Sequence, residues 1–222
     1  MQLIRLYYLR SMNNKGAVAE KLLQINAIKL SVSNPFIWAS GWKSPIYCDN
    51  RKALSFPDAR DFIKSEMCDA VLGLYRSIDL IAGVATAGIP WGAMVADQLK
   101  LPFIYVRPKP KEHGLANQIE GFYQSGKTVV LIEDLISTGK SSLQVAEVLR
   151  TAELNIKGLI SIFNYGFDKA KSSFDSMSIS FQSLTDYETL ILKAIEKNII
   201  SEDDQNALLN WRKDPENWKV NT

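Results

Sequence analysis

The segment from Val129 to Ser141 carries the clearest arrangement of residues for chemistry. Four apolar residues, Val129–Ile132, precede two acids, Glu133 and Asp134, and two more apolar residues lead into Ser137–Ser141. If the apolar run is a strand and a helix follows it, Ser137–Ser141 offers hydroxyl and backbone N–H groups at a helix N-terminus, where a phosphate is favoured. The two carboxylates are acceptors for vicinal hydroxyl groups. A phosphate on one side and a diol on the other describe a ribose 5-phosphate, and the alternative is an ordinary strand–helix junction with a solvated acidic pair.

The tripeptide Gly139-Lys140-Ser141 also resembles the end of a nucleotide-binding P-loop. That motif requires a glycine five positions before Gly139, and Asp134 stands there. Its negative charge would repel a triphosphate, so the sequence argues against a P-loop.

Residues 107–113 carry a second chemical pattern, a basic or protonatable side chain at every second position. The four residues are Arg107, Lys109, Lys111 and His113. The intervening prolines disfavour a helix and keep the segment extended, so the four side chains are expected to project to one side. Such a row suits a polyanion, and a solvated basic loop is the alternative.

The composition excludes several classes of protein. The 222 residues are 46% hydrophobic and 23% charged, the balance of a globular domain that buries a core without disulfides. Lys and Arg number 26 against 24 Asp and Glu, which argues against a protein built mainly to coat nucleic acid. His113, Cys48 and Cys68 do not lie at the spacing of a zinc site, and two free thiols are expected. No apolar run reaches the ~18 residues of a membrane span and no signal peptide is evident, so a cytoplasmic protein is expected.

The order of the elements predicts an α/β protein with a mainly parallel sheet covered on both faces. Strands are expected at 79–85, 103–106, 128–133, 156–163 and 179–181, and helices at 14–30, 57–75, 89–100, 138–153, 185–197 and 201–213. Ser55 is a plausible cap of the second helix, with Pro57 near its first position. Ligands bind at the carboxyl ends of such strands, which directs attention to the residues after Ala85, Val106 and Glu133.

The chain is expected to form a single domain over residues 12–222. Residues 1–11 read as a possible upstream extension, because Met12 would serve well as an initiator. Residues 14–56 are expected to form a small N-terminal part, a helix followed by short strands in the Ser-, Asn-, Pro-, Gly- and aromatic-rich run 31–56, and the core is expected at about 57–213.

The run Leu131–Gly139 resembles the phosphoribosyl-diphosphate signature of the type I phosphoribosyltransferases. The resemblance implies their fold, a mainly parallel sheet flanked by helices with a small N-terminal hood. It also implies that Glu133 and Asp134 hold the ribose hydroxyls of 5-phospho-α-D-ribose 1-diphosphate (PRPP). The ribose and 5-phosphate contacts implied further along are Leu135, Ile136, Ser137, Thr138, Gly139, Lys140 and Ser141. The implied diphosphate-binding loop is Ala85, Thr86, Ala87 and Gly88, whose small side chains let backbone N–H groups approach a phosphate.

Two further segments resemble the orotate phosphoribosyltransferases. Arg107 and the run Lys111-Glu112-His113-Gly114 match the pattern of their catalytic loop, and Phe36–Arg51 looks like their hood, with the Ser-Gly-x-x-Ser-Pro core intact. The chain departs from the pattern at Pro108, where relatives commonly carry lysine, and at Ala87 and Ala39, where some relatives do. An arginine expected near the orotate carboxylate is not evident in the run Phe163-Asn164-Tyr165-Gly166.

The resemblance implies transfer of ribose 5-phosphate from PRPP to orotate, giving orotidine 5′-monophosphate and diphosphate in pyrimidine (UMP) biosynthesis. The implied catalytic residues are Arg107, Lys109, Lys111 and His113, and the implied orotate contacts are Ser137, Lys43 and Tyr47. Mg²⁺ is expected as cofactor, held through PRPP and through Asp134 by way of water, with no direct protein ligand. A homodimer is implied, in which the 107–114 loop acts in the neighbouring subunit's site, with no nucleic-acid or membrane partner.

Two other functions remain open at this point. One is a phosphoribosyltransferase for a purine base, and the other is a non-catalytic regulator of the same fold that senses PRPP. The hood and the cationic loop argue against both.

Overall fold

A six-stranded sheet forms the centre of the computed structural model, which describes residues 14–38, 41–109 and 118–219. The strand order is β10-β9-β8-β5-β6-β7. The strands are β5 (Leu80–Val84), β6 (Phe103–Val106), β7 (Ile119–Glu120), β8 (Thr128–Ile136), β9 (Asn155–Asn164) and β10 (Phe181–Asp186). Every neighbouring pair is parallel except β6–β7. The predicted α/β fold with a mainly parallel sheet is confirmed.

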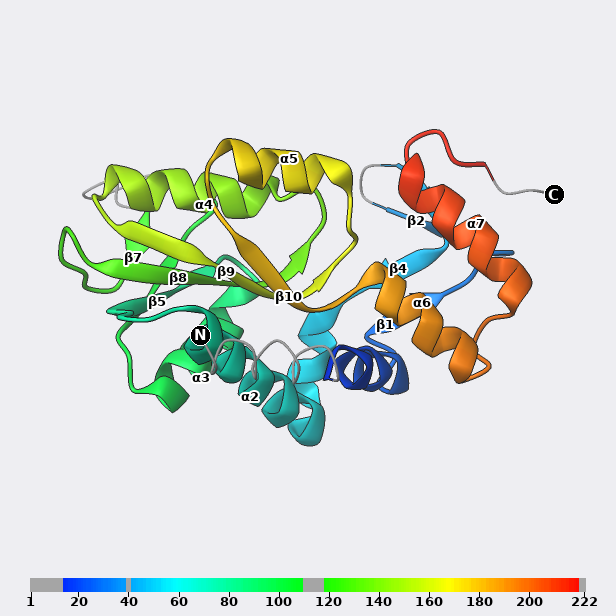
Figure 1. Ribbon diagram of the computed structural model, residues 1–222, viewed down its shortest axis with the longest axis horizontal. Helices are drawn as coiled ribbons and strands as arrows, with labels where there is room; N and C mark the ends of the chain where they lie inside the picture. Colours follow the sequence, from blue (N-terminus) through cyan, green and yellow to red (C-terminus); the bar gives the residue numbers. More distant parts are fainter. Residues whose placement is uncertain (1–13, 39–40, 110–117, 220–222) are drawn as a thin grey trace.

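Helices cover both faces of this sheet (Figure 1). α2 (Pro57–Leu74) and α3 (Gly88–Leu99) lie on one face, and α4 (Lys140–Thr151) and α5 (Asp168–Ser176) on the other. Along β8, Leu131 belongs to the core beneath α4 and α5, whereas Ile132 belongs to the core beneath α2 and α3. Successive side chains therefore enter opposite cores, which explains why the strand sequence is almost continuously apolar.

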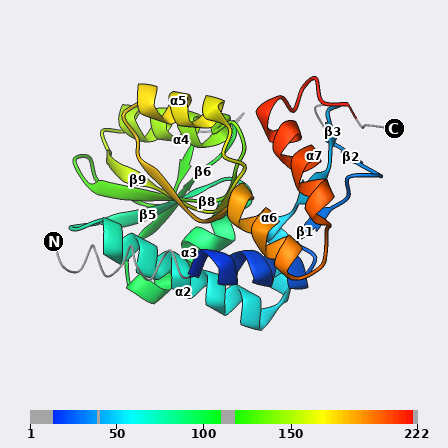
Figure 2. The same ribbon diagram turned by 45° about the vertical axis from the view of Figure 1, so that its right-hand side comes forward.

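The N-terminal part lies at one end of the sheet beside the last two helices (Figures 1 and 2). It comprises a helix over residues 14–24, β1 (Ile28–Leu30), β2 (Phe36–Ile37), β3 (Lys43–Ser44), β4 (Ile46–Cys48) and the 3₁₀ helix η1 (Asn50–Ser55). β1 pairs with β4 and β2 pairs with β3, both antiparallel. The neighbouring helices are α6 (Tyr187–Glu196) and α7 (Glu202–Lys213). We keep the name hood for residues 28–55.

Several predicted boundaries need correction. The first helix ends at residue 24 rather than 30, because Asn26 takes a left-handed φ of 54° and the chain continues as β1. Phe56, not Ser55, is the N-cap of α2, while Pro57 is at its start as predicted. The third predicted strand, 128–133, continues to Ile136 because Leu135 and Ile136 pair with β9. The strand predicted at 179–181 lies instead at Phe181–Asp186.

Two elements have no counterpart in the prediction. The helix α5 buries only Ala170 and Phe174, so its apolar pattern is too sparse to detect in the sequence. The strand β7 has two residues, Ile119 and Glu120, and depends on pairing with β6. Among the described helices, none combines the length and hydropathy that a bilayer crossing requires.

Candidate active site

The acid pair lies near the carboxyl end of β8. Glu133 is only 5% exposed, and its Oε2 accepts a hydrogen bond of 3.2 Å from the Ser142 hydroxyl of α4. Its Oε1 accepts the backbone N–H of Asp134 at 2.9 Å. Asp134 is half-buried and faces the hood, where the charges of Arg51 and Asp49 act on it.

Both acids titrate at a higher pH than a free carboxyl group. Burial, followed by the charge of Asp134, raises the pKa of Glu133 well above its ordinary value. Burial also raises the pKa of Asp134, although hydrogen bonding to Glu133 and the Arg51 charge oppose the effect. A ligand that brings a hydroxyl donor or a cation would stabilise the charged form of two neighbouring, poorly solvated carboxyl groups.

The turn after the acid pair leaves the first backbone N–H groups of α4 available. Gly139 is the N-cap of α4, with a left-handed φ of 79°, and it has no side chain to cap the helix. A Cβ at this position would lie 2.6 Å from Cε2 of Phe174, so the turn requires glycine in both conformation and space. N–H groups at a helix start without a side-chain cap form a natural anion site.

The loop between β5 and α3 packs directly against β8. Gly88, the first residue of α3, is buried, and a Cβ there would collide with the carbonyl oxygen of Ile132. The same Cβ would lie 3.3 Å from the Cα of Glu133. Glycine therefore brings the loop Ala85–Ala87 beside the acid pair, as the sequence interpretation requires.

A cavity of about 370 Å³ separates the hood from the ends of β8 and β9. Its lining residues are Ile37, Trp38, Tyr47, Cys48, Leu135, Ser137 and Tyr165. Aromatic walls with a few polar atoms suit a flat heterocyclic ring. Of the three predicted orotate contacts, Tyr47 and Ser137 line this cavity. Lys43 lies instead on another hollow, with Gly41, Trp42 and residues 216–219.

Arg107, the first residue of the cationic segment, follows β6 and lies next to the loop between β5 and α3. Val84 and Val106 are paired across β5 and β6, so Arg107 and Ala85 follow neighbouring strand ends. The backbone N–H of Arg107 donates to the carbonyl of Gln118 at 2.9 Å, and the Gln118 side chain donates back to the Arg107 carbonyl at 2.8 Å. The Arg107 guanidinium lies 3.8 Å from Glu120. Lys109 is exposed, whereas Lys111 and His113 lie outside the described residues.

Residues 63–184 match the family model for a phosphoribosyl transferase domain. The orotate phosphoribosyltransferase of Phocaeicola vulgatus is 52% identical over 202 residues, covering 91% of this chain and 95% of that protein. The enzyme of the same name from Bacteroides fragilis is 51% identical over 94% of this chain and 98% of its own length. The chain belongs to the orotate phosphoribosyltransferase family. The crystal structure of the orotate phosphoribosyltransferase from Aeropyrum pernix has a TM-score of 0.69 at 31% identity, covering 82% of this chain and 97% of that one.

The type I phosphoribosyltransferase fold and the enzyme class inferred from the sequence are therefore confirmed. The domain match ends at residue 184 and begins at residue 63, so it contains the acid pair and both phosphate-type loops but neither the hood nor α7. Orotate phosphoribosyltransferase relatives, in contrast, align over nine-tenths of this chain. The aromatic cavity is lined by residues of both the hood and the matched domain.

Sequence reasoning missed several residues that the structure brings to this site. Asn50 is fully buried, and its side-chain N–H donates to the Asp134 carbonyl at 2.8 Å, which joins the hood to the end of β8. Arg51 pairs with Asp49 at 2.6 Å and lies close enough to Asp134 to oppose the rise in its pKa. Tyr165 replaces the expected arginine after β9 and forms a wall of the cavity. The run Asp49-Asn50-Arg51 forms the end of the segment Phe36–Arg51 that resembles the hood, which was the available signal.

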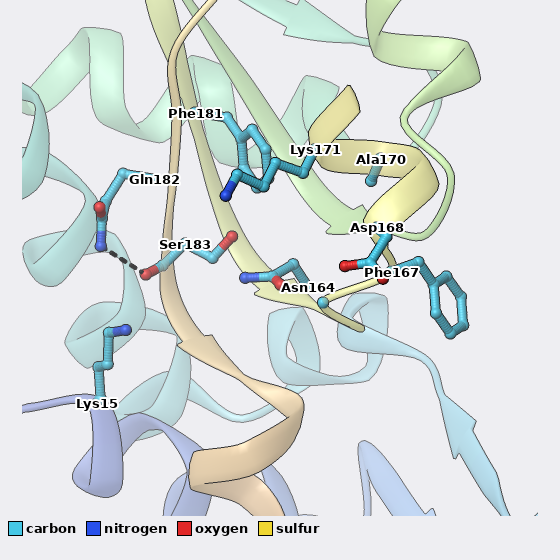
Figure 3. Close-up of a pocket in the computed structure, with 10 residues that line it drawn as sticks. Lys15, Asn164, Phe167, Asp168, Ala170, Lys171, Phe181, Gln182 and Ser183 are labelled. Atoms are coloured by element: carbon cyan, nitrogen blue, oxygen red, sulfur yellow. Dashed lines mark hydrogen bonds between the residues drawn. The ribbon is translucent and has the colours of Figure 1, made fainter. Parts of the chain in front are cut away.

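A second hollow, of about 270 Å³, lies beside β10 and the start of α5 (Figure 3). Lys15, Asp168 and Lys171 line it together with Asn164 and Ser183. None of the predicted site residues belongs to it, and its lining mixes both signs of charge. We therefore place the chemistry at the ends of β5, β8 and β9 rather than here.

Proposed function

We propose that the chain transfers the 5-phosphoribosyl group of PRPP to N1 of orotate, releasing diphosphate and forming orotidine 5′-monophosphate for pyrimidine biosynthesis. One observation carries the proposal. Leu135 and Ser137, which directly follow the acid pair, also line the aromatic cavity. A ribose held by the acids would therefore present its anomeric carbon to a ring in the cavity.

The donor half of the proposal rests on Glu133, Asp134 and the turn after them. The carboxyl oxygens would accept the ribose 2- and 3-hydroxyls, and the residues Ser137–Ser141 would take the 5-phosphate through N–H and hydroxyl groups. The backbone of Ala85–Gly88 would face the diphosphate, since its small side chains allow a close approach.

The residues present suit a magnesium ion held mainly by the substrate. Within the described ranges no group of three His, Cys, Asp or Glu side chains lies close enough to form a metal cage. Mg²⁺ commonly binds through substrate phosphates together with carboxylates, and the half-buried Asp134 would supply a carboxylate to it through water. When bound, the ion neutralises charge on the diphosphate.

The acceptor half of the proposal places orotate in the cavity between Trp38, Tyr47 and Tyr165. These rings exclude water from the faces of the pyrimidine, and Ser137 offers a hydroxyl at the edge nearest the ribose. Lys43 could reach the orotate carboxylate only from the neighbouring hollow. Orotate needs no strong base, because its N–H is acidic enough to ionise near neutral pH.

The leaving group requires positive charge, which Arg107, Lys109 and Lys111 supply where the negative charge of diphosphate develops. His113 would donate a hydrogen bond or a proton to a departing oxygen, because imidazole carries a transferable proton near neutral pH. We further propose a homodimer in the cytoplasm, with residues 107–114 acting in the neighbouring subunit's site.

A spectrophotometric assay with orotate, PRPP and Mg²⁺ tests this function, with parallel reactions containing adenine, hypoxanthine or uracil. Of the four bases, we expect only orotate to be turned over. Turnover with a purine base would identify a purine phosphoribosyltransferase instead. Binding of PRPP without turnover of any base would identify a non-catalytic sensor.

A further inference from the structure

Trp211 is a fully buried residue of α7, in a part of the chain that the phosphoribosyl transferase domain match does not reach. In both ribbon views α7 runs alongside the hood rather than along the central sheet (Figures 1 and 2). A buried tryptophan in a terminal helix usually anchors that helix to the core. Its particular neighbours give Trp211 a second role.

Two of the rings that touch Trp211 are walls of the base cavity. The Trp38 ring meets it edge to face, with centroids 5.4 Å apart at 76°, and the Tyr165 ring does so at 5.8 Å and 67°. Trp38 and Tyr165 also contact each other at 5.2 Å. Trp211 itself does not line the cavity, so it lies behind the two walls and supports both. Edge-to-face pairs have a preferred geometry, so this contact fixes the positions of the rings as well as burying them.

A hydrogen bond links the same indole to the backbone of the hood. Nε1 of Trp211 donates to the carbonyl oxygen of Lys43 in β3 at 3.1 Å. The helix α7 is also held by Tyr187 of α6, whose hydroxyl donates to the Leu208 carbonyl at 2.9 Å and whose ring lies 5.7 Å from that of Trp211. The indole therefore connects a helix with a fixed position to the β2–β3 hairpin, whose first strand leads into Trp38.

We propose that Trp211 is a positioning residue for the acceptor base: it sets the separation of Trp38 and Tyr165 and so determines how well orotate is held. The inference rests on the proposed function, because it takes the cavity to be the orotate site. No described contact joins Trp211 to the acid pair or to the loops at Ala85–Gly88 and Ser137–Ser141, so PRPP should be bound independently of it.

The test compares steady-state kinetics of Trp211→Leu and Trp211→Phe in the full-length protein. Trp211→Leu removes both ring contacts and the N–H donor, and we expect the KM for orotate to rise about 10-fold or more, since a displacement near 1 Å can cost up to about 100-fold. Trp211→Phe keeps a ring in contact with Trp38 and Tyr165 but loses the donor to Lys43, and it should recover most of the orotate affinity. The KM for PRPP should stay within about twofold in both variants.

Leu208→Ala is the matched control, because Leu208 is a fully buried residue of the same helix whose side chain makes neither a ring contact nor a hydrogen bond to Trp38 or Tyr165. It should lower thermal stability without raising the KM for orotate. Equal rises in the KM values for orotate and PRPP in Trp211→Leu, or an equal rise for orotate in Leu208→Ala, would overturn the proposal. A wild-type protein without orotate turnover would instead contradict the proposed function, so the two failures are distinguishable.

Discussion

The donor half of the site and its acceptor half are held together by different forces. In the donor half, the residues follow adjacent strands of one parallel sheet, where Gly83 pairs with Ile132 and Val84 with Val106. Their relative positions are thus set by backbone hydrogen bonds. The acceptor half joins the hood, the end of β9 and α7 through aromatic contacts, with few hydrogen bonds between those segments.

The difference shows how one fold can accommodate different bases. A backbone ladder tolerates changes of side chain without shifting its register, so the donor half can stay the same while the chemistry around it varies. Aromatic packing responds to each substitution, so the shape of the base cavity can change with few residues. This separation predicts that variants in the donor half should alter the kinetics of PRPP, and that variants in the acceptor half should alter those of orotate.

The strongest test of the donor half is Lys111→Ala. We expect turnover to fall more than ~100-fold while the protein stays folded, because the lysine supplies charge where the diphosphate departs. A stopped or coupled assay at saturating PRPP and orotate measures this turnover. Lys197→Ala is a suitable control, since that ammonium pairs with Glu20 at 2.6 Å between two outer helices. Near-wild-type turnover in Lys111→Ala would refute the catalytic assignment of the segment.

Asp134→Asn should produce the next largest effect. Removing the charge that faces the hood should lower kcat/KM for PRPP about 10- to 100-fold and leave the KM for orotate nearly unchanged. Asp79→Asn provides the matched control, because Asp79 lies before β5, at the opposite end of the sheet, and accepts hydrogen bonds from Thr128. Unchanged PRPP kinetics in Asp134→Asn would count against its ribose-holding role.

Tyr165→Leu tests the acceptor half directly. Loss of one cavity wall should raise the KM for orotate about 10-fold with little change for PRPP, because the ring is a wall of the aromatic cavity and contacts the ring of Trp38. Tyr165→Phe separates the ring from the phenol group. If the KM for PRPP rose as much as that for orotate, the two halves would not be separable.

Glu133→Gln should have the smallest effect on the fold, and it should be stabilising. Because burial raises the pKa of Glu133 above its unfolded value, its contribution to stability is fully present below that unfolded value and is lost as the pH rises toward the folded one. The amide carries no charge that burial would desolvate, so at pH 8 the variant should be more stable by about 0.5–2 kcal/mol, the range common for single stabilising substitutions. Urea unfolding at pH 5 and pH 8 measures the difference, which should grow with pH. A variant less stable at pH 8 would show that the carboxylate is needed for packing.

The segment Glu133–Ser141 of the donor half could be located from the sequence because its residues are consecutive. The apolar run, the acid pair and the glycine turn follow one another within a single strand–helix unit, and the chemistry is visible in their order. The extension of β8 to Ile136 could not be foreseen, since it depends on pairing with Phe163 and Asn164 of β9.

Most of the acceptor half could not be predicted. Trp38 belongs to the segment Phe36–Arg51 that resembles the hood, but Tyr165 and Trp211 lie far from it in the chain, and an isolated aromatic residue in a sequence indicates a core position. Their meeting depends on how the hood and α7 pack, which no local pattern encodes. Tyr47 and Ser137 were found only because the hood motif and the phosphate turn resembled known ones, and Lys43 in the same motif faces a different hollow.

The paired ends of segment 107–118 have a consequence best stated in polymer terms. The mutual hydrogen bonds of Arg107 and Gln118, with the β6–β7 ladder beyond them, close the segment into a loop whose ends meet. The entropy of closing such a loop grows only with the logarithm of its length, so doubling the number of residues would cost about 0.6 kcal/mol. Stability therefore places almost no limit on the length of this segment. Under the proposed function, its length would instead be limited by the distance from the sheet to the diphosphate.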